Sequence, residues 1–141
     1  MRTRRTLIIL AVAALLPLGY MYQTLLLGRP LGRDDASVMV YPLFHALDAA
    51  LARGDLYLWD QQQWCGLPAL AGGETTGLYP LTLLLFGLLP WITALHLSYW
   101  LHLALAVVAC FWVARNLGAT YGPALVAAVA YAFSGYQAAH L

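Results

Sequence analysis

Long apolar runs alternate with one polar segment along this chain. Residues Thr6 to Leu27 form 22 positions without a charge, which is enough to cross a hydrocarbon core of about 30 Å. A second apolar run extends from Ala94 to Ala114, and a third from Tyr121 to Leu141. A cleaved signal peptide is the alternative for the first run, but its apolar residues continue beyond an h-region of about 7–15 residues. The three runs therefore predict three transmembrane helices, the first of them an uncleaved anchor.

Two shorter segments predict helices of other kinds. Apolar residues follow Val40 at offsets of 3, 4, 7 and 11, and this stripe predicts an amphipathic helix. Pro42 suits the first turn of that helix, and Gly54 suits its C-terminal end. This helix would lie on the membrane surface or pack on other protein, and the pattern favours neither. Leu78 to Trp91 is too short to span and predicts a re-entrant or interfacial segment. The stripe consists of Val40, Leu43, Phe44, Leu47 and Leu51.

The predicted fold class is all-α, a polytopic integral membrane protein with about three transmembrane helices. Residues 1–141 would form the N-terminal part of one membrane domain. Its parts are span 1 (6–27), an extracytoplasmic loop (28–77), the re-entrant or interfacial segment (78–91), span 2 (94–114) and span 3 (121–141). Because the chain is still apolar at Leu141, we expect it to be a fragment of a longer protein.

The charged residues indicate how the chain lies in a membrane. Only 9% of residues are charged and 62% are hydrophobic, whereas soluble domains average about 25% charged residues. Arginines before the first run and after the second predict a cytoplasmic N-terminus and an outward-facing loop. These arginines are Arg2, Arg4, Arg5 and Arg115. No basic stripe is present, so the sequence gives no support for nucleic-acid binding.

All acidic residues lie in the polar segment between Gly32 and Pro80. They are Asp34, Asp35, Asp48, Asp55, Asp60 and Glu74. Asp34 and Asp35 are adjacent, and one of them suits a helix N-cap. Two carboxylates exceed what capping needs, so general-base or metal-ligand chemistry is the competing interpretation. A divalent metal ion is therefore a candidate cofactor, with no defined ligand set.

Aromatic residues are frequent in the same loop. Tyr57, Trp59 and Trp64 could stack on sugar rings, or they could belong to an aromatic layer at the lipid headgroups. Together with Glu74 they are the candidate substrate-binding residues.

Two histidines and two cysteines complete the candidate chemistry. His96 and His102 are six residues apart on the second span, so we expect helix packing with hydrogen bonds rather than a metal pair. Cys65 and Cys110 lie at different depths, and we expect no disulfide between them.

An ordered series of short motifs resembles the N-terminal part of the YfhO-like bacterial membrane proteins, which belong to the GT-C glycosyltransferase superfamily. The resemblance extends from Arg4 to Leu141. Its motifs are Asp35 with Tyr41-Pro42, the element from Gly54 to Asp60, Gly66-Leu67-Pro68, Tyr79-Pro80-Leu81 and Ala132-Phe133-Ser134-Gly135. Tyr57 stands where the family usually has proline.

The resemblance implies a multi-span enzyme of the bacterial cytoplasmic membrane. Such an enzyme would transfer a sugar from a polyprenyl-phosphate donor to a cell-envelope acceptor outside the membrane. The resemblance assigns the role of the catalytic acidic residue to Asp35, with Asp34 as the alternate. This residue would act as a base or through a metal ion. Two other interpretations stay open. One is a transporter or flippase component with a path lined by His96, His102 and 78–91, and the other is a non-catalytic membrane subunit.

Overall fold

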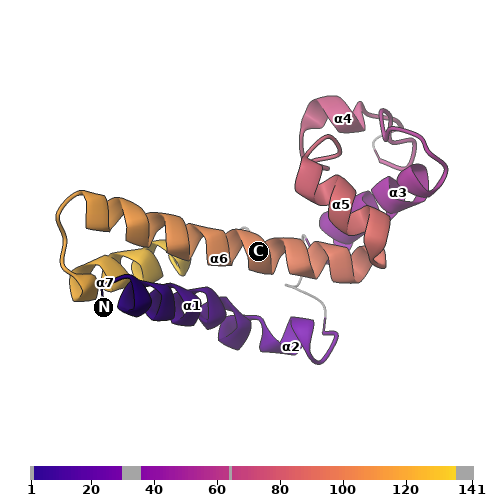
Figure 1. Cartoon of the computed structure of the whole chain (residues 1–141). Helices are drawn as coiled ribbons and strands as arrows, with labels where there is room; N and C mark the ends of the chain where they lie inside the picture. Colours follow the sequence, from indigo (N-terminus) through magenta and orange to yellow (C-terminus); the bar gives the residue numbers. More distant parts are fainter. Residues whose placement is uncertain (1, 30–35, 64, 136–141) are drawn as a thin grey trace. The chain divides into compact units, whose positions relative to one another are not determined.

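The computed structural model describes residues 2–29, 36–63 and 65–135 (Figure 1). These residues are mostly helical, and among them no β-strand is found, only an isolated antiparallel bridge between Asp60 and Leu67. The all-α prediction is therefore confirmed. The chain divides into two compact units, which are described separately: unit 1 (1–29 and 99–141) and unit 2 (30–98).

Unit 1 is built from long apolar helices. It contains α1 (Arg2–Tyr20), α2 (Tyr22–Leu25), the later part of α6 (Trp91–Asn116) and α7 (Tyr121–Ala132). Val107 and Phe111 on α6 form a buried cluster with three alanines of α7, and all five are at most 1% exposed. The alanines are Ala124, Ala128 and Ala132. The small-residue face of α7 is thus buried against α6.

Two contacts fix the direction of α1 relative to α7. The hydroxyls of Thr6 and Tyr121 lie 3.1 Å apart, so the start of α1 is next to the start of α7. At the other end, the rings of Tyr20 and Phe133 meet edge to face at 5.5 Å. The two helices therefore run parallel. Helix α6, which lies between them in the sequence, runs in the opposite direction (Figure 1).

The first apolar run is interrupted, unlike the single helix expected over residues 6–27. Helix α1 ends at Tyr20, the amide of Met21 donates to the Pro17 carbonyl at 2.8 Å, and α2 begins at Tyr22. Pro17 has no amide hydrogen to donate, and Gly19 two residues later is a poor helix former. These two residues weaken the helix where it ends.

Helix α6 is the one helix among the described residues that is long and apolar enough to cross a membrane. Its 26 residues extend about 39 Å at 1.5 Å per residue. Its most apolar 18-residue stretch has a mean hydropathy of 1.8, yet only 22% of that stretch is buried. A core helix of a soluble protein would be mostly buried. The predicted span 94–114 lies within α6, and shorter apolar helices cover Ile9–Tyr20 and Tyr121–Ala132.

Unit 2 contains a π-helical turn (Ala36–Val40), α3 (Tyr41–Ala52), α4 (Ala69–Gly72), α5 (Pro80–Leu88) and the first residues of α6. The predicted amphipathic helix is α3, which ends before Gly54 at a φ of 75°. Leu43, Phe44 and Leu47 from its stripe are buried, and the Phe44 ring stacks on Phe86 of α5 at 5.6 Å. Part of the apolar face of α3 therefore packs on protein, namely on α5.

Helix α5 is the predicted short segment between Pro80 and Pro90. It has nine residues, which extend about 14 Å and cannot cross a hydrocarbon core of about 30 Å. Pro80 occupies the first turn, where its missing amide hydrogen has no cost. The helix is short, as expected for a segment that does not span.

Candidate functional site

The candidate site is the loop that connects α3 to α5, residues 53–79 of unit 2. A pair of backbone hydrogen bonds of 2.8 and 2.9 Å joins Asp60 to Leu67. The turn between them has positive φ at Cys65 and Gly66, and the Gly66 amide donates to the Gln63 carbonyl at 2.7 Å. Backbone hydrogen bonds within the loop therefore join its two arms.

Asp60 is the buried acid of this loop. Its side chain is only 2% exposed, and its Oδ1 accepts a hydrogen bond of 2.8 Å from the amide of Gln62. Burial and the neighbouring Asp60 carboxylate raise the pKa of the Tyr57 hydroxyl above its usual value. Burial of the hydroxyl is the larger cause of this pKa shift, and the Asp60 carboxylate adds to it.

Trp59 packs directly on Gly66. A Cβ added at Gly66 would lie 2.7 Å from Nε1 of Trp59, a distance that real Cβ atoms do not reach. The φ of 116° at Gly66 also excludes most other residues. The backbone conformation therefore favours glycine, and any Cβ at this position would displace the Trp59 indole, which is on a residue that is 55% exposed.

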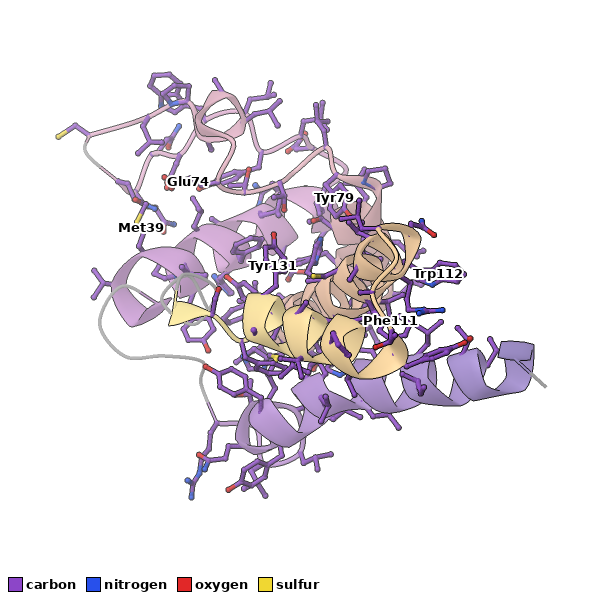
Figure 2. All side chains as sticks on the ribbon, turned by 90° about the vertical axis from the view of Figure 1, so that its left-hand side faces the viewer. Met39, Glu74, Tyr79, Phe111, Trp112 and Tyr131 are labelled. Carbon is purple, nitrogen blue, oxygen red and sulfur yellow. The ribbon has the colours of Figure 1, made fainter. Side chains whose placement is uncertain are left out.

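Threonines close the loop where it meets α5. The hydroxyls of Thr76 and Thr82 lie 2.9 Å apart, and the Tyr79 amide donates to the Thr76 carbonyl at 2.8 Å. Thr75 is 1% exposed, and its hydroxyl is buried without a hydrogen-bond partner. Glu74, the preceding residue, is exposed (Figure 2).

The sequence-predicted site residues are distributed unevenly. Asp34, Asp35 and Trp64 lie outside the described residues. Of the remaining three, Trp59 presents an exposed ring, Glu74 is exposed, and Tyr57 is half-buried with its hydroxyl inside. Tyr57 and Trp59 lie near the Asp60–Leu67 bridge, and no hydrogen bond or ion pair of Glu74 connects it to them in the described part of the chain.

Sequence reasoning did not single out Asp60. Its burial depends on the bridge to Leu67, a contact that no local pattern shows. One local signal was available: an aspartate followed by polar residues and a glycine is typical of a turn in which the side chain accepts from the backbone two residues on. The Gln62 amide makes this hydrogen bond.

An aromatic and histidine cluster lies at the base of unit 2. The Tyr41 hydroxyl is 3.2 Å from Nε2 of His96, which is 4% exposed. Trp91 makes edge-to-face contacts with Tyr41 at 5.9 Å and with His45 at 5.4 Å. The expectation that His96 packs with a hydrogen bond to a neighbour is confirmed.

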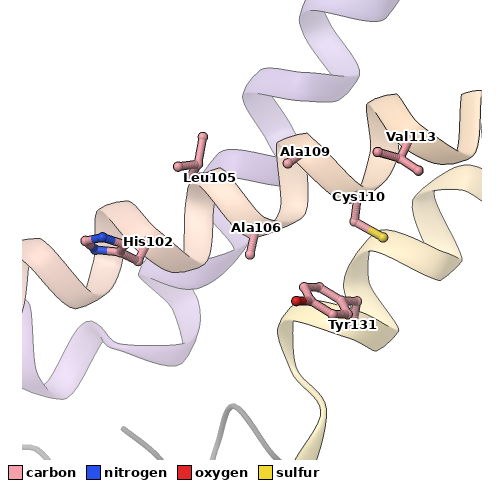
Figure 3. Close-up of a pocket in the computed structure, with 7 residues that line it drawn as sticks. All are labelled: His102, Leu105, Ala106, Ala109, Cys110, Val113 and Tyr131. Atoms are coloured by element: carbon pink, nitrogen blue, oxygen red, sulfur yellow. The ribbon is translucent and has the colours of Figure 1, made fainter. Parts of the chain in front are cut away.

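A pocket of about 490 Å³ opens along α6 in unit 1 (Figure 3). Its lining is mostly apolar and includes His102 toward one end and Cys110 and Tyr131 toward the other. Cys110 of this lining and Cys65 are free thiols in the structure. Within the described ranges, no three His, Cys, Asp or Glu side chains are grouped so that they could hold a metal ion. These residues therefore do not provide a site for the divalent metal considered above.

No protein-family model, curated protein or solved structure matches the chain. The similarity to YfhO-like proteins therefore depends on the short motifs alone. Two of these motifs contribute the residues that close the loop. The element from Gly54 to Asp60 contributes Trp59 and Asp60, and the element Gly66-Leu67-Pro68 contributes Gly66 and Leu67.

Proposed function

We propose that this chain is part of a multi-span membrane glycosyltransferase of the GT-C type. It would transfer a sugar from a polyprenyl-phosphate-linked donor to a cell-envelope acceptor outside the bacterial cytoplasmic membrane. The observation that carries the proposal is the ordered loop of unit 2, which combines a buried carboxylate with exposed aromatic and apolar side chains. A lipid-linked sugar likewise combines a polar part, the sugar ring, with an apolar part, the lipid chain.

The exposed side chains of the loop suit such a donor. Trp59 offers a fixed indole face, and an aromatic face stacks well on the apolar side of a sugar ring. Other large exposed side chains of the same region are Leu56, Leu58, Leu78 and Tyr79. Tyr57 would contribute its ring rather than its buried hydroxyl, and Trp64 and Glu74 complete the proposed binding residues.

Asp35 is the proposed catalytic base, with Asp34 as the alternate. An acceptor hydroxyl needs a carboxylate near its proton, and this help is worth about 10²–10⁴ in rate. Both aspartates precede α3 by only a few residues in the sequence. If a metal ion takes part, these two carboxylates are the candidates to bind it.

The arrangement of helices in unit 1 supports a multi-span chain with a cytoplasmic N-terminus. Because α1 and α7 run parallel and α6 runs in the opposite direction, three spans would cross alternately. Arg2, Arg4, Arg5 and Arg115 would then all lie on the cytoplasmic side. The loop 28–77, which follows the first span in the sequence, would then face outward.

The test is transfer of labelled sugar from a polyprenyl-phosphate donor in membranes, normalised to protein level. Asp35→Asn should lower transfer at least 100-fold, because asparagine can still cap a helix but cannot accept the proton. Asp34→Asn tells which of the pair acts. Asp55→Asn is the matched control, since Asp55 is exposed and paired only with Arg53 at 3.5 Å. Normal transfer by the Asp34/Asp35 double variant would remove this pair from the mechanism.

The transport alternative depends on His96, His102 and the segment 78–91. The structure engages His96 with Tyr41 and packs Phe86 of α5 on Phe44, so both have structural roles. A non-catalytic subunit would show no transfer in the same assay, with or without the substitutions.

A further inference from the structure

One end of unit 1 collects positive charge. Arg2, Arg4 and Arg5 lie in the first turns of α1, and Arg115 lies in the last turn of α6. The Thr6–Tyr121 contact of 3.1 Å brings the start of α1 to the start of α7, directly after the α6–α7 turn. The four arginine positions therefore lie at one end of the unit, which we call the arginine end.

Arg115 is fixed in orientation at this end. Its guanidinium carbon lies 4.1 Å from the centroid of the Tyr121 ring, and Nη1 donates to the Ala119 carbonyl. A guanidinium has five N–H donors in a planar fork, so one hydrogen bond and a stacked face leave donors for an anion. Stacking also reduces the ordering cost of binding, because the group is already positioned.

No acidic residue of unit 1 neutralises these arginines. Residues 1–29 and 99–141 contain five arginines and no aspartate or glutamate, since all six acids lie between positions 34 and 74. The counter-charge at the arginine end must therefore come from outside the unit. Phosphate is a suitable partner, because the guanidinium fork matches its oxygens.

Exposed apolar side chains surround the same end. They are Leu7, Trp112, Val113 and Leu117, which are 61%, 49%, 58% and 83% exposed (Figure 2 labels Trp112). A soluble anion would leave these side chains in water, whereas a phospholipid covers them with its acyl chains. Tryptophan is also enriched at the headgroup level of membranes.

We propose that the arginine end is a binding surface for anionic phospholipids. The phosphate would lie on the Arg115 guanidinium, and the acyl chains would lie along Trp112 and Val113. This inference does not depend on the proposed sugar transfer. It requires only that unit 1 is embedded in a bilayer.

Quenching of Trp112 fluorescence tests the proposal in the full chain. Trp59, Trp64, Trp91 and Trp100 are replaced by phenylalanine, and the protein is reconstituted in phosphatidylcholine vesicles. Brominated phosphatidylglycerol or brominated phosphatidylcholine is then added to both leaflets at equal mole fraction, so the direction of insertion does not matter. We expect phosphatidylglycerol to quench at several-fold lower mole fraction, because each basic residue near the surface is worth about fivefold in affinity for anionic lipid.

The arginine variants decide the outcome. Arg115→Gln should reduce the preference about fivefold, and the triple change Arg2→Gln, Arg4→Gln and Arg5→Gln should reduce it further. Arg115→Lys should keep part of it, which separates loss of charge from loss of folding. Arg29→Gln is the matched control, an exposed arginine of unit 1 outside the arginine end, and should have no effect.

Three results would overturn the proposal. They are equal quenching by the two lipids, an equal loss of preference in Arg29→Gln, and removal of the preference by inorganic phosphate. The last would indicate a site for soluble anions. As a second readout, the class of lipid that co-purifies with the unmodified chain should be enriched in phosphatidylglycerol relative to the membrane, and the enrichment should fall in Arg115→Gln.

Discussion

The hydroxyl of Tyr41 lies 3.2 Å from Nε2 of His96, and this contact joins the first turn of α3 to the start of α6. The residues are 55 positions apart in sequence. Since His96 is 4% exposed, the hydrogen bond satisfies a ring nitrogen that water does not reach freely.

Tyr41→Phe should therefore lower stability. Removing one partner of a buried hydrogen bond costs about 1–3 kcal/mol. The measurement is the free energy of unfolding in detergent, followed by tryptophan fluorescence. The same substitution at Tyr131, which is 56% exposed on α7, should change stability by less than about 0.5 kcal/mol. Equal effects of the two substitutions would show that the contact with His96 is unimportant.

Gly66→Ala should open the loop at Trp59. The new Cβ would meet the indole at 2.7 Å, and the positive φ adds strain of about 1–3 kcal/mol. We expect a red shift of Trp59 emission and faster proteolysis between residues 54 and 68. Gly73→Ala is the control, because its φ is also positive but no atom lies within 4 Å of the added Cβ. If both variants behave alike, backbone strain rather than the Trp59 contact explains the effect.

Tyr57 should give the loop a dependence on alkaline pH. Its pKa is raised in the folded state by burial and by Asp60, so the folded protein keeps the hydroxyl proton at a pH where the unfolded chain loses it. The resulting stability is complete below the unfolded value of 10.0 and is lost as pH rises above it. Unfolding measured between about pH 9 and 11.5 should show this loss. The slope should become shallower in Tyr57→Phe, and an unchanged slope would contradict the assignment.

Ala128→Leu should disturb the core of unit 1. Ala128 is fully buried in the cluster with Val107 and Phe111, and overpacking costs about 1–3 kcal/mol. Ala127→Leu adds the same side chain to an exposed position of α7 and should be neutral. Thermal unfolding in detergent compares the two. A lower melting temperature for Ala127→Leu than for Ala128→Leu would contradict the described packing.

Local patterns were sufficient for some elements. The stripe from Val40 to Leu51 and the proline and glycine at its ends gave α3 almost residue by residue, because a helix repeats its faces every 3.6 residues. The length of the second apolar run predicted a long helix, and this helix is α6.

Other features depend on residues far apart in sequence. Hydropathy alone did not show that the first run breaks at Met21, because every residue there is uncharged. Asp60 becomes the buried acid only through the turn that ends at Leu67, and His96 finds Tyr41 across 55 positions. A pattern of single residues does not contain such pairings. The roles of Asp34, Asp35 and Trp64 stay predictions, because these residues lie outside the described part of the chain.

The alanine face of α7 has a consequence for how its register on α6 is chosen. Ala124, Ala128 and Ala132 repeat every four residues, so a slide of α7 by one turn would present nearly the same surface to Val107 and Phe111. The alanines alone cannot distinguish these two alignments. The contacts of Tyr121 with Thr6 and Arg115 can, because they occur once and only at the end of the helix. The polar contacts at the start of α7 therefore decide between the two alignments, which the alanine face alone does not distinguish.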